Sequence, residues 1–394
     1  MKISNLILVG IFLLLIFGFG IGTLVTPDKD KSALENRELQ QRPDLTIKRI
    51  LSGDYFKKFT AYFNDQFLGR NDWVEAESKV KKHVLKKRVV HSIYVAKDGY
   101  LIEPIKKGQL SPETVADKVN AFASDMKKRN IDVYFALAPQ KTVMLGDQLP
   151  KYLPSYGNQL SDAVLKDFSK NVKAIDLRSA IKPHMGKQQM YFYTDHHWKP
   201  KAAFYGYREV IQKMAQQHPN LGKPLQKNQF TWKKDPKPFY GSYARKVGKA
   251  YVKHPDHVTI VKAKFKEKPY RICYKGSCDR GFNYMKAAKS QKVWANRYQV
   301  YLGGSLPEVT IQNPNKPQGQ NLLILKDSYS HPMIQFLARH FKEIDVLDLR
   351  HTDKNVYKYV EKHDIDTVLF VHNIETLVDN KAVTQFHKPD NKNS

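Results

Sequence analysis

The last hundred residues of this chain alternate short apolar segments with helix-like segments, and this alternation constrains the fold most. Leu322-Leu323-Ile324-Leu325 is a continuous apolar run, which is typical of a buried strand in a parallel sheet. Strands that alternate with helices through short connections form parallel sheets covered by helices on both faces. The sequence therefore predicts an α/β fold. We predict strands at 133–138, 173–177, 322–326, 344–349 and 367–371, and helices at 112–129, 200–216, 331–340 and 354–362.

The N-terminal segment is long and apolar enough to cross a membrane. Residues 6–25 contain only Thr23 and a few glycines among apolar side chains, and such a helix reaches about 30 Å, the thickness of the hydrocarbon core. We predict a membrane anchor at 1–26, with a cleaved signal peptide as the alternative. The flanking charges favour an extracytoplasmic body, and hence a single-pass protein of the cell membrane.

The chain has 394 residues, enough for one large domain with additions or for two domains. Residues 27–90 are expected to form a stalk and a membrane-proximal helical segment that packs on the main domain or lies on the bilayer. A main domain is expected at 91–386, with an irregular insertion at about 220–300. Residues 387–394 are polar and are expected to be a disordered tail.

The net charge of +28, from 66 Lys and Arg against 38 Asp and Glu, would ordinarily suggest nucleic-acid binding. An extracytoplasmic body argues against that partner. Anionic headgroups or an anionic wall polymer suit the charge better. A charge that serves solubility alone is an equal alternative.

The chain contains two cysteines, Cys273 and Cys278. In an oxidising exterior they could close a small hairpin with a disulfide. A zinc site is disfavoured because two thiolates need two further ligands, and no close pair offers them. A reduced pair is the alternative.

Ser328 follows the apolar strand where a helix is predicted to begin. Sites in open α/β sheets form at the carboxyl ends of strands, and free backbone N–H groups at a helix N-terminus can stabilise an oxyanion. The position therefore suits a nucleophile. A helix cap is the alternative role for this serine, and Asp327 and Ser330 are equal candidates for that cap.

Asp195-His196-His197-Trp198 is the densest cluster of reactive groups in the chain. Asp195 and His197 are two residues apart, so both can point to the same side of a turn or extended segment. The carboxylate could then hold Nδ1–H while Nε2 takes the proton of a serine. His196 would point elsewhere, and Trp198 would pack the site or stack on a sugar ring. A surface turn and a metal-binding Asp-His-His cluster are the alternatives.

The same four residues match the motif of the DHHW protein family, which is similar to the SGNH-hydrolase-like alginate O-acetylation (AlgX/AlgJ-like) proteins. Those proteins carry Asp-x-His-Trp upstream and Gly-Asp-Ser-x-Ser downstream, where this chain has Lys326-Asp327-Ser328-Tyr329-Ser330. The resemblance spans roughly residues 32–380, including Glu35-Asn36-Arg37 and Asp98-Gly99-Tyr100-Leu101. In that group the aspartate and the histidine also precede the serine along the chain, as they do here.

The resemblance implies a flavodoxin-like SGNH-hydrolase domain. It implies O-acetyl transfer to, or removal from, an extracytoplasmic polysaccharide, with Ser328 as nucleophile, His197 as base and Asp195 as orienter. No cofactor and no metal are expected, and a membrane-bound O-acyltransferase is the expected partner and acetyl source. A non-catalytic glycan-binding scaffold of a polysaccharide modification or export complex is the alternative function.

Further site residues are expected around these three. The N–H of Ser328 is the expected first donor to an oxyanion, with Gly304 or the Asn373 amide as the second; a structural turn is the alternative role for the glycine. Lys326 replaces the glycine of the broader group, and it either points away from the site or holds an anionic substrate. The candidates for contacting the glycan are Trp198, Lys326 and Lys141.

Overall fold

The computed structural model describes residues 3–32, 34–35 and 37–387, and the chain divides into two compact units. The first unit comprises residues 1–88 and 244–252, and the second comprises residues 89–243 and 253–394. Asn36 of the resemblance and nearly all of the predicted tail, residues 388–394, lie outside the described residues.

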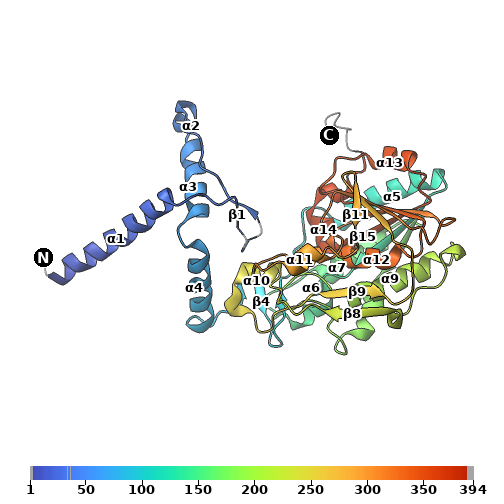
Figure 1. Cartoon of the computed structure of the whole chain (residues 1–394), viewed down its shortest axis with the longest axis horizontal. Coiled ribbons are helices and arrows are strands. Elements are labelled where there is room, and N and C mark those ends of the chain that lie inside the picture. The colour runs from blue at the N-terminus through green and yellow to red at the C-terminus, as the bar shows by residue number, and fades with distance from the viewer. Residues whose placement is uncertain (1–2, 33, 36, 388–394) are drawn as a thin grey trace. The chain divides into compact units, whose positions relative to one another are not determined.

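The first unit is mainly helical (Figure 1). Its helix α1 (Ile3–Val25) is long and apolar enough to cross a membrane. Phe19 of α1 lies 5.9 Å from Phe67 and 5.5 Å from Trp73, measured between ring centroids. The remaining elements are β1 (Lys31–Ser32), β2 (Arg37–Glu38), α2 (Ile47–Leu51), α3 (Asp54–Gln66) and α4 (Arg70–His83).

The second unit is built on an eight-stranded mixed sheet. Its strands are β6 (Asp132–Ala138), β7 (Val172–Asp176), β10 (Arg271–Tyr274), β11 (Ser277–Arg280), β12 (Glu308–Gln312), β13 (Asn321–Lys326), β14 (Glu343–Leu347) and β15 (Thr367–Asn373). They follow the order β11-β10-β12-β14-β13-β15-β6-β7. The strands from β14 to β7 are parallel, and β12, β10 and β11 extend one edge in antiparallel pairing. β13 therefore lies inside the parallel part, between β14 and β15.

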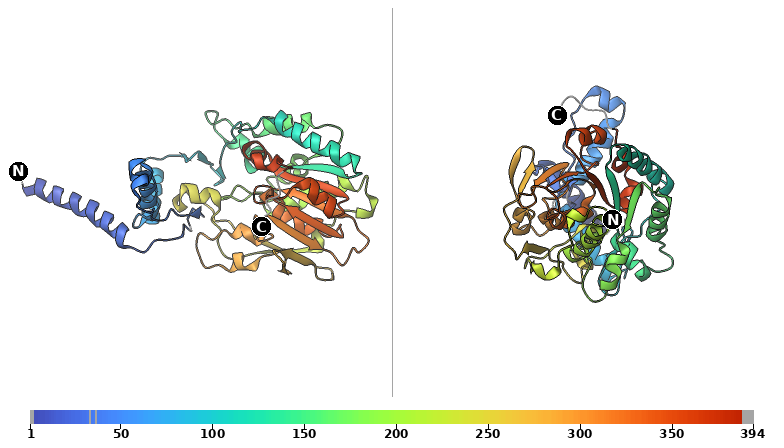
Figure 2. Two further views of the ribbon diagram at one scale, coloured as in Figure 1. Left: turned by 90° about the horizontal axis from the view of Figure 1, so that it is seen from above. Right: turned by 90° about the vertical axis from the view of Figure 1, so that its right-hand side faces the viewer.

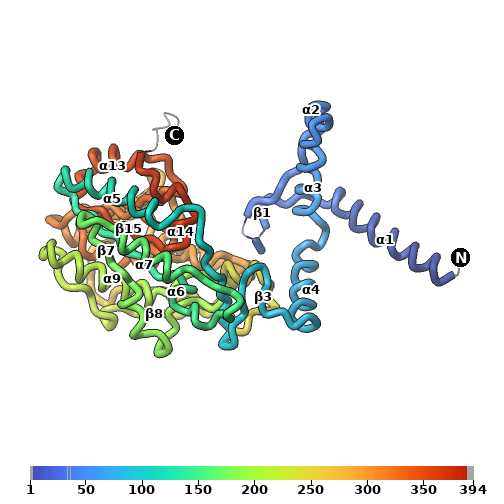
Figure 3. The backbone as a smooth tube through the Cα atoms, turned by 180° about the vertical axis from the view of Figure 1, so that it is seen from behind, coloured from blue at the N-terminus to red at the C-terminus, as the bar shows by residue number. Residues whose placement is uncertain are grey.

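Helices cover both faces of this sheet (Figure 2). Successive side chains of a strand point to opposite faces, so a continuous apolar strand makes both faces apolar, and both must be buried. Leu322 and Ile324 of β13 pack with α9 (Pro200–Met214) and α12 (His331–Leu337). Leu323 and Leu325 pack on the other face. Each such buried side chain contributes roughly 1.5–3 kcal/mol of transfer free energy. The helices of that second face, labelled in Figure 3, are α5 (Pro112–Lys128), α7 (Gly157–Asp167), α13 (Val356–Lys362) and α14 (Ile374–Asp379).

The predicted α/β class is confirmed, and the predicted strands and helices of the parallel sheet are found to within a few residues. The segment 220–300 is more ordered than its lack of periodicity indicated: β8 (Phe230–Lys234) pairs with β9 (Thr259–Ala263), and β10 and β11 join the main sheet. β10 pairs with β12 and so forms hydrogen bonds with backbone groups that would otherwise lie at an exposed edge of the sheet. The smaller elements are β3 (Val89–Val90), β4 (Ile93–Val95), β5 (Leu101–Ile102), α6 (Lys141–Leu145), α8 (Arg178–Ile181), α10 (Ser242–Val247) and α11 (Met285–Lys289).

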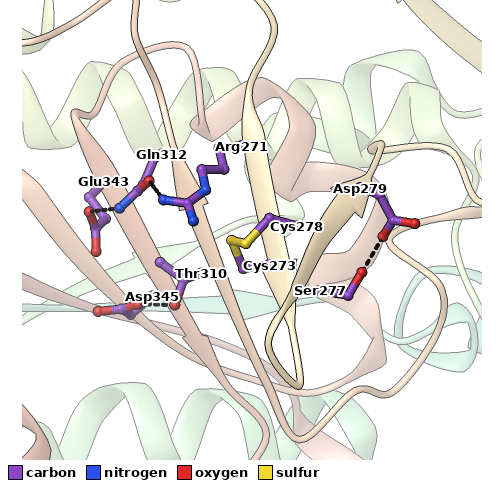
Figure 4. The surroundings of a disulfide bond; sticks show 9 residues. All are labelled: Arg271, Cys273, Ser277, Cys278, Asp279, Thr310, Gln312, Glu343 and Asp345. Carbon is purple, nitrogen blue, oxygen red and sulfur yellow. Dashed lines mark hydrogen bonds between the residues drawn. A yellow bond between two sulfur atoms is a disulfide. The ribbon is translucent and has the colours of Figure 1, made fainter.

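Cys273 and Cys278 are linked by a disulfide across the β10–β11 hairpin (Figure 4). Cys273 also pairs with Thr310 of β12 in the sheet ladder. The bond therefore closes the last hairpin of the antiparallel edge, and a hairpin of two short strands is only marginally stable by itself.

We expect the double variant Cys273→Ser/Cys278→Ser to lower the free energy of unfolding by at most about 2 kcal/mol, because the cross-link closes only a short loop. Thermal unfolding of the full chain with and without reductant measures this loss. Reductant should bring the wild type to the variant's midpoint and leave the variant unchanged. An unchanged midpoint of the wild type in reductant would contradict the pairing; the variant, which has no cysteine, controls for other effects of the reductant.

Candidate active site

Ser328 lies directly after β13, at the carboxyl end of the parallel sheet. Asp327 caps the 3-10 helix Ser328–Ser330: its carboxylate accepts a hydrogen bond from the backbone N–H of Tyr329 at 2.8 Å. The same carboxylate accepts from the backbone N–H of Asn373 at 2.7 Å and from its side-chain amide at 2.6 Å. Because Asp327 serves as the cap, the hydroxyl of Ser328 is left for another partner.

Asp195-His196-His197-Trp198 lies in a hairpin turn. Tyr191 and Trp198 form a β-bridge, and the N–H of Phe192 donates to the carbonyl of His197 at 3.2 Å. The turn brings the side chains of Asp195 and His197 to the same side. Oδ1 of Asp195 accepts from Nδ1–H of His197 at 2.5 Å and from the backbone N–H of His197 at 3.0 Å.

The other ring nitrogen of His197 contacts Ser328. Nε2 of His197 lies 2.7 Å from Oγ of Ser328, although the two residues are 131 positions apart. Because Nδ1–H is donated to Asp195, Nε2 is the nitrogen that accepts the hydroxyl proton. The three side chains thus have the geometry of a serine, a base and an orienting carboxylate.

The electrostatics of Asp195 suit this role. Burial alone would raise the pKa of Asp195, but the adjacent imidazoles of His197 and His196 and the hydrogen bonds it accepts hold that pKa well below its usual value. One of those bonds comes from the backbone N–H of Ser242, at 2.8 Å from Oδ2. The carboxylate is therefore ionised at neutral pH and can stabilise an imidazolium.

Tyr329 joins the serine turn to the histidine turn. The indole N–H of Trp198 donates to the carbonyl of Tyr329 at 2.8 Å, and the Tyr329 hydroxyl donates to the carbonyl of His196 at 2.6 Å. Trp198 is fully buried. The prediction that Trp198 contacts glycan is therefore wrong: its ring is a packing element, and its N–H holds the two turns together.

Tyr298 is a site residue that sequence reasoning missed. Its ring stacks on that of His197, with 3.7 Å between centroids and 10° between planes. Its hydroxyl donates to the carbonyl of Ser328 at 3.0 Å. Tyr298 thus contacts both His197 and the serine turn. It lies in the segment 220–300, whose richness in tyrosine was the only signal in the sequence.

Asp256 and Gly241 were missed as well. The buried carboxylate of Asp256 accepts from the backbone N–H groups of Tyr193 at 2.9 Å and Thr194 at 2.6 Å, immediately before Asp195. Gly241 approaches Asp195 so closely that a Cβ added to it would lie 2.2 Å from the Cβ of Asp195. Any side chain there would displace the orienting carboxylate, so the position requires glycine.

Two of the three predicted oxyanion donors are already engaged. Both amide hydrogens of Asn373 have acceptors, Asp327 at 2.6 Å and Thr376 Oγ1 at 2.8 Å. The N–H of Gly304 donates to the carbonyl of Tyr301 at 3.1 Å within a turn. The structure therefore argues against both as donors to an oxyanion. The N–H of Ser328 begins a 3-10 helix and so lacks an intrahelical acceptor.

The two lysines expected to contact glycan are buried, and that expectation is wrong for both. The ammonium of Lys326 lies 2.8 Å from Oδ2 of Asp348 and 2.9 Å from Nε2 of His331. Burial lowers the pKa of Lys326. Lys141 donates to the carbonyls of Phe192 at 3.1 Å and Tyr193 at 3.2 Å, at the start of the hairpin turn. Both lysines support the site from inside the fold.

His196 keeps the supporting role that the sequence indicated. Its Nδ1 lies 2.7 Å from Oγ of Ser242, and its ring lies 3.7 Å from that of His197. Ligand atoms of Asp195, His196 and His197 lie within 4.8 Å of one another, close enough to ligate one metal ion. Such an ion would compete with the Asp195–His197 and His197–Ser328 contacts for the same atoms.

The substitution Gly241→Ala should displace Asp195 and slow the reaction of Ser328 with a fluorophosphonate by about 10²-fold, because an error of about 1 Å in a catalytic group has that effect. The labelling rate of the full chain measures this. Gly146→Ala is the matched control, since an added Cβ there meets nothing within 4 Å. Equal labelling of the two variants would contradict the role given to Gly241.

Burial lowers the pKa of Lys141 from 10.5 to about 7. Between these values the unfolded chain binds more protons than the folded one, so Lys141 makes stability rise as pH increases from about 7 towards 10. In Lys141→Met this rise should be smaller than in the wild type. Thermal midpoints of both proteins across pH 7–9.5 test it, and parallel profiles would contradict the buried position of the ammonium.

Part of the chain is similar in sequence, and most of it is similar in structure, to known proteins. A family model described as an SGNH hydrolase-like domain, acetyltransferase AlgX, matches residues 100–268. No curated protein sequence matches the chain. PatB1 of Bacillus cereus is similar in structure, with a TM-score of 0.61 and 26% identity over 75% of this chain and 99% of that chain. The same protein with a sulfonyl adduct gives a TM-score of 0.61 and 25% identity, over 75% and 100% of the two chains.

A DHHW family protein from Eubacterium siraeum has a TM-score of 0.62 and 20% identity, over 74% of this chain and 93% of that chain. This likeness concerns the fold. Together with the match to residues 100–268, it confirms the resemblance on which the sequence interpretation depended: residues 100–268 are similar to an SGNH hydrolase-like domain, and the second unit is similar in fold to a DHHW family protein.

Proposed function

We propose that this chain is an extracytoplasmic O-acetyltransferase or acetylesterase that acts on a cell-surface polysaccharide or exopolysaccharide. The observation that carries the proposal is the 2.7 Å contact between Nε2 of His197 and Oγ of Ser328, with Asp195 at 2.5 Å from Nδ1. The similarity of residues 100–268 to the acetyltransferase AlgX supports acyl transfer in general. The sulfonyl adduct of PatB1 adds support, because sulfonyl electrophiles react with activated nucleophiles.

In the proposed reaction, Oγ of Ser328 attacks the carbonyl carbon of an acetyl ester while its proton passes to Nε2 of His197. The tetrahedral intermediate then collapses, His197 returns the proton to the departing alcohol oxygen, and the acetyl group stays on Ser328. A sugar hydroxyl takes the acetyl group in transfer, and water takes it in hydrolysis. The N–H of Ser328 is the proposed first donor to the oxyanion.

The proposal places the second unit outside the cell membrane, with α1 as its anchor. The length and apolar character of α1 support this placement. A cleaved signal peptide would release the same unit on the same side of the membrane, so the chemistry does not depend on which of the two occurs. A membrane-bound O-acyltransferase is the proposed acetyl source, as the resemblance to the alginate O-acetylation proteins implies.

Ser328→Ala should abolish labelling by a fluorophosphonate, and His197→Gln should slow hydrolysis of nitrophenyl acetate by at least about 10³-fold. Ser330→Ala is the matched control, because Ser330 lies in the same turn but its hydroxyl donates to the carbonyl of Asp327 at 2.9 Å. Ser330→Ala should keep most of the labelling.

Full labelling of Ser328→Ala would refute the nucleophile. Loss of the wild-type activity in a chelator would favour a metal ion at Asp195, His196 and His197 instead. Glycan binding with no turnover of nitrophenyl acetate, and no effect of His197→Gln, would favour the non-catalytic scaffold.

A further inference from the structure

The second unit contains a cavity whose lining does not include Ser328, His197 or Asp195. Its lining residues come from the antiparallel β8–β9 pair, from α11 and the segment before it, and from the end of α12; Figure 1 labels these elements. Its volume of about 820 Å³ is within the range of about 300–1,000 Å³ that is usual for small-ligand sites. Ser328 precedes α12, whereas the lining residues Gln335 and Arg339 lie near and just beyond the other end of that helix.

The cavity is strongly basic. Two acidic side chains, Asp235 and Glu267, stand against six basic ones. Among the residues that the structure describes, none of the five lysines of the lining forms an ion pair. Like charges held around one cavity raise its positive potential and attract an anion. The basic side chains are Lys233, Lys234, Lys262, Lys266, Lys289 and Arg339.

Arg339 is a fixed charge in the lining of the cavity. Its side chain is 8% exposed and pairs with Glu267 at 2.6 Å. Its guanidinium carbon lies between 5.3 and 5.8 Å from the centroids of four aromatic rings, an arrangement that holds the cation by cation–π attraction. Its Nε has no hydrogen-bond partner. Those four rings are Phe230, Phe265, Tyr270 and Phe282.

The cavity also has an apolar wall. Phe265, Phe282 and Met285 line it together with the strand residues Ile260 and Val261. A bare inorganic anion would leave this wall unused and would fill a small part of the volume. An occupant that combines a negative group with a ring of mixed polarity would use both the lysines and the aromatic side chains.

We propose that this cavity is a second binding site, for an acidic saccharide unit: a sugar ring that carries a carboxylate or a phosphate. The lysines bind the anionic group, and Phe265 and Phe282 pack against the apolar face of the ring. This inference rests on the proposed function, because the polymer held in the cavity is the one presented to Ser328. It narrows the substrate to an anionic glycan.

Calorimetry on the full chain in neutral detergent tests the proposal with three matched probes: trigalacturonate, phosphorylated maltotriose and neutral maltotriose. The double variant Lys262→Glu/Lys266→Glu reverses two charges of the lining. Lys264→Glu/Lys268→Glu is the matched control, because it makes the same change of charge in the same segment at exposed lysines outside the lining.

We expect at least one acidic probe to bind the wild type, and its dissociation constant to rise about tenfold or more in Lys262→Glu/Lys266→Glu while staying within about twofold in the control. Preference for trigalacturonate would identify a carboxylate, and preference for the phosphorylated sugar a phosphate. Neutral maltotriose should bind much more weakly than either. Equal weakening in the two double variants, no weakening in either, or no binding of an acidic probe would overturn the proposal.

The binding test of the cavity and the labelling test of Ser328 can fail separately. Ser328→Ala should bind the acidic probe like the wild type, and Lys262→Glu/Lys266→Glu should keep the fluorophosphonate labelling of Ser328. Unchanged binding in Lys262→Glu/Lys266→Glu with normal labelling would refute the acidic-saccharide site alone. Labelling that persists in Ser328→Ala would refute the proposed function, whatever the binding data show.

Discussion

The buried carboxylate of Asp327 is the interaction on which the candidate active site depends. A buried carboxylate must be matched by donors, and Asp327 finds them in the backbone of Tyr329 and in the backbone and side chain of Asn373. These bonds join the end of β13 to the end of β15 and start the 3-10 helix that carries Ser328. The candidate nucleophile Ser328 is therefore positioned by two central strands, β13 and β15. Because Asp327 caps the helix, the hydroxyl of Ser328 is free to contact His197.

The hairpin turn with His197 is held against this platform by residues from outside its own motif. Trp198 and Tyr329 join the two turns, Asp256 fixes the backbone just before Asp195, and Tyr298 stacks on the base. Asp256 and Tyr298 come from the segment 220–300, which has no helical or strand periodicity. Neither Asp256 nor Tyr298 lies in a strand or an α-helix of that segment, so periodicity could not indicate where their side chains point.

Several site residues could be predicted, and the two errors that concern lysines have one physical cause. Asp195, His197 and Ser328 were named from spacing and position, and the structure brings them together. Lys326 and Lys141 were misjudged because a charged side chain in a sequence ordinarily indicates exposure. Lys326 ends a central strand, and its partner Asp348 comes from beyond the neighbouring strand. A buried pair of this kind depends on strand order, which local sequence does not contain.

The sequence by itself determined the elements and the local pairings: the α/β class, the apolar helix α1, and the carboxylate that reaches an imidazole two residues away. These follow from periodicity and short-range geometry, which act within a few residues. Only the tertiary structure decided that His197 meets Ser328 across 131 residues, that Trp198 and two lysines are buried, and that six basic side chains surround one cavity. Those features depend on how strands are ordered and how loops pack over them, and packing is a property of the whole chain.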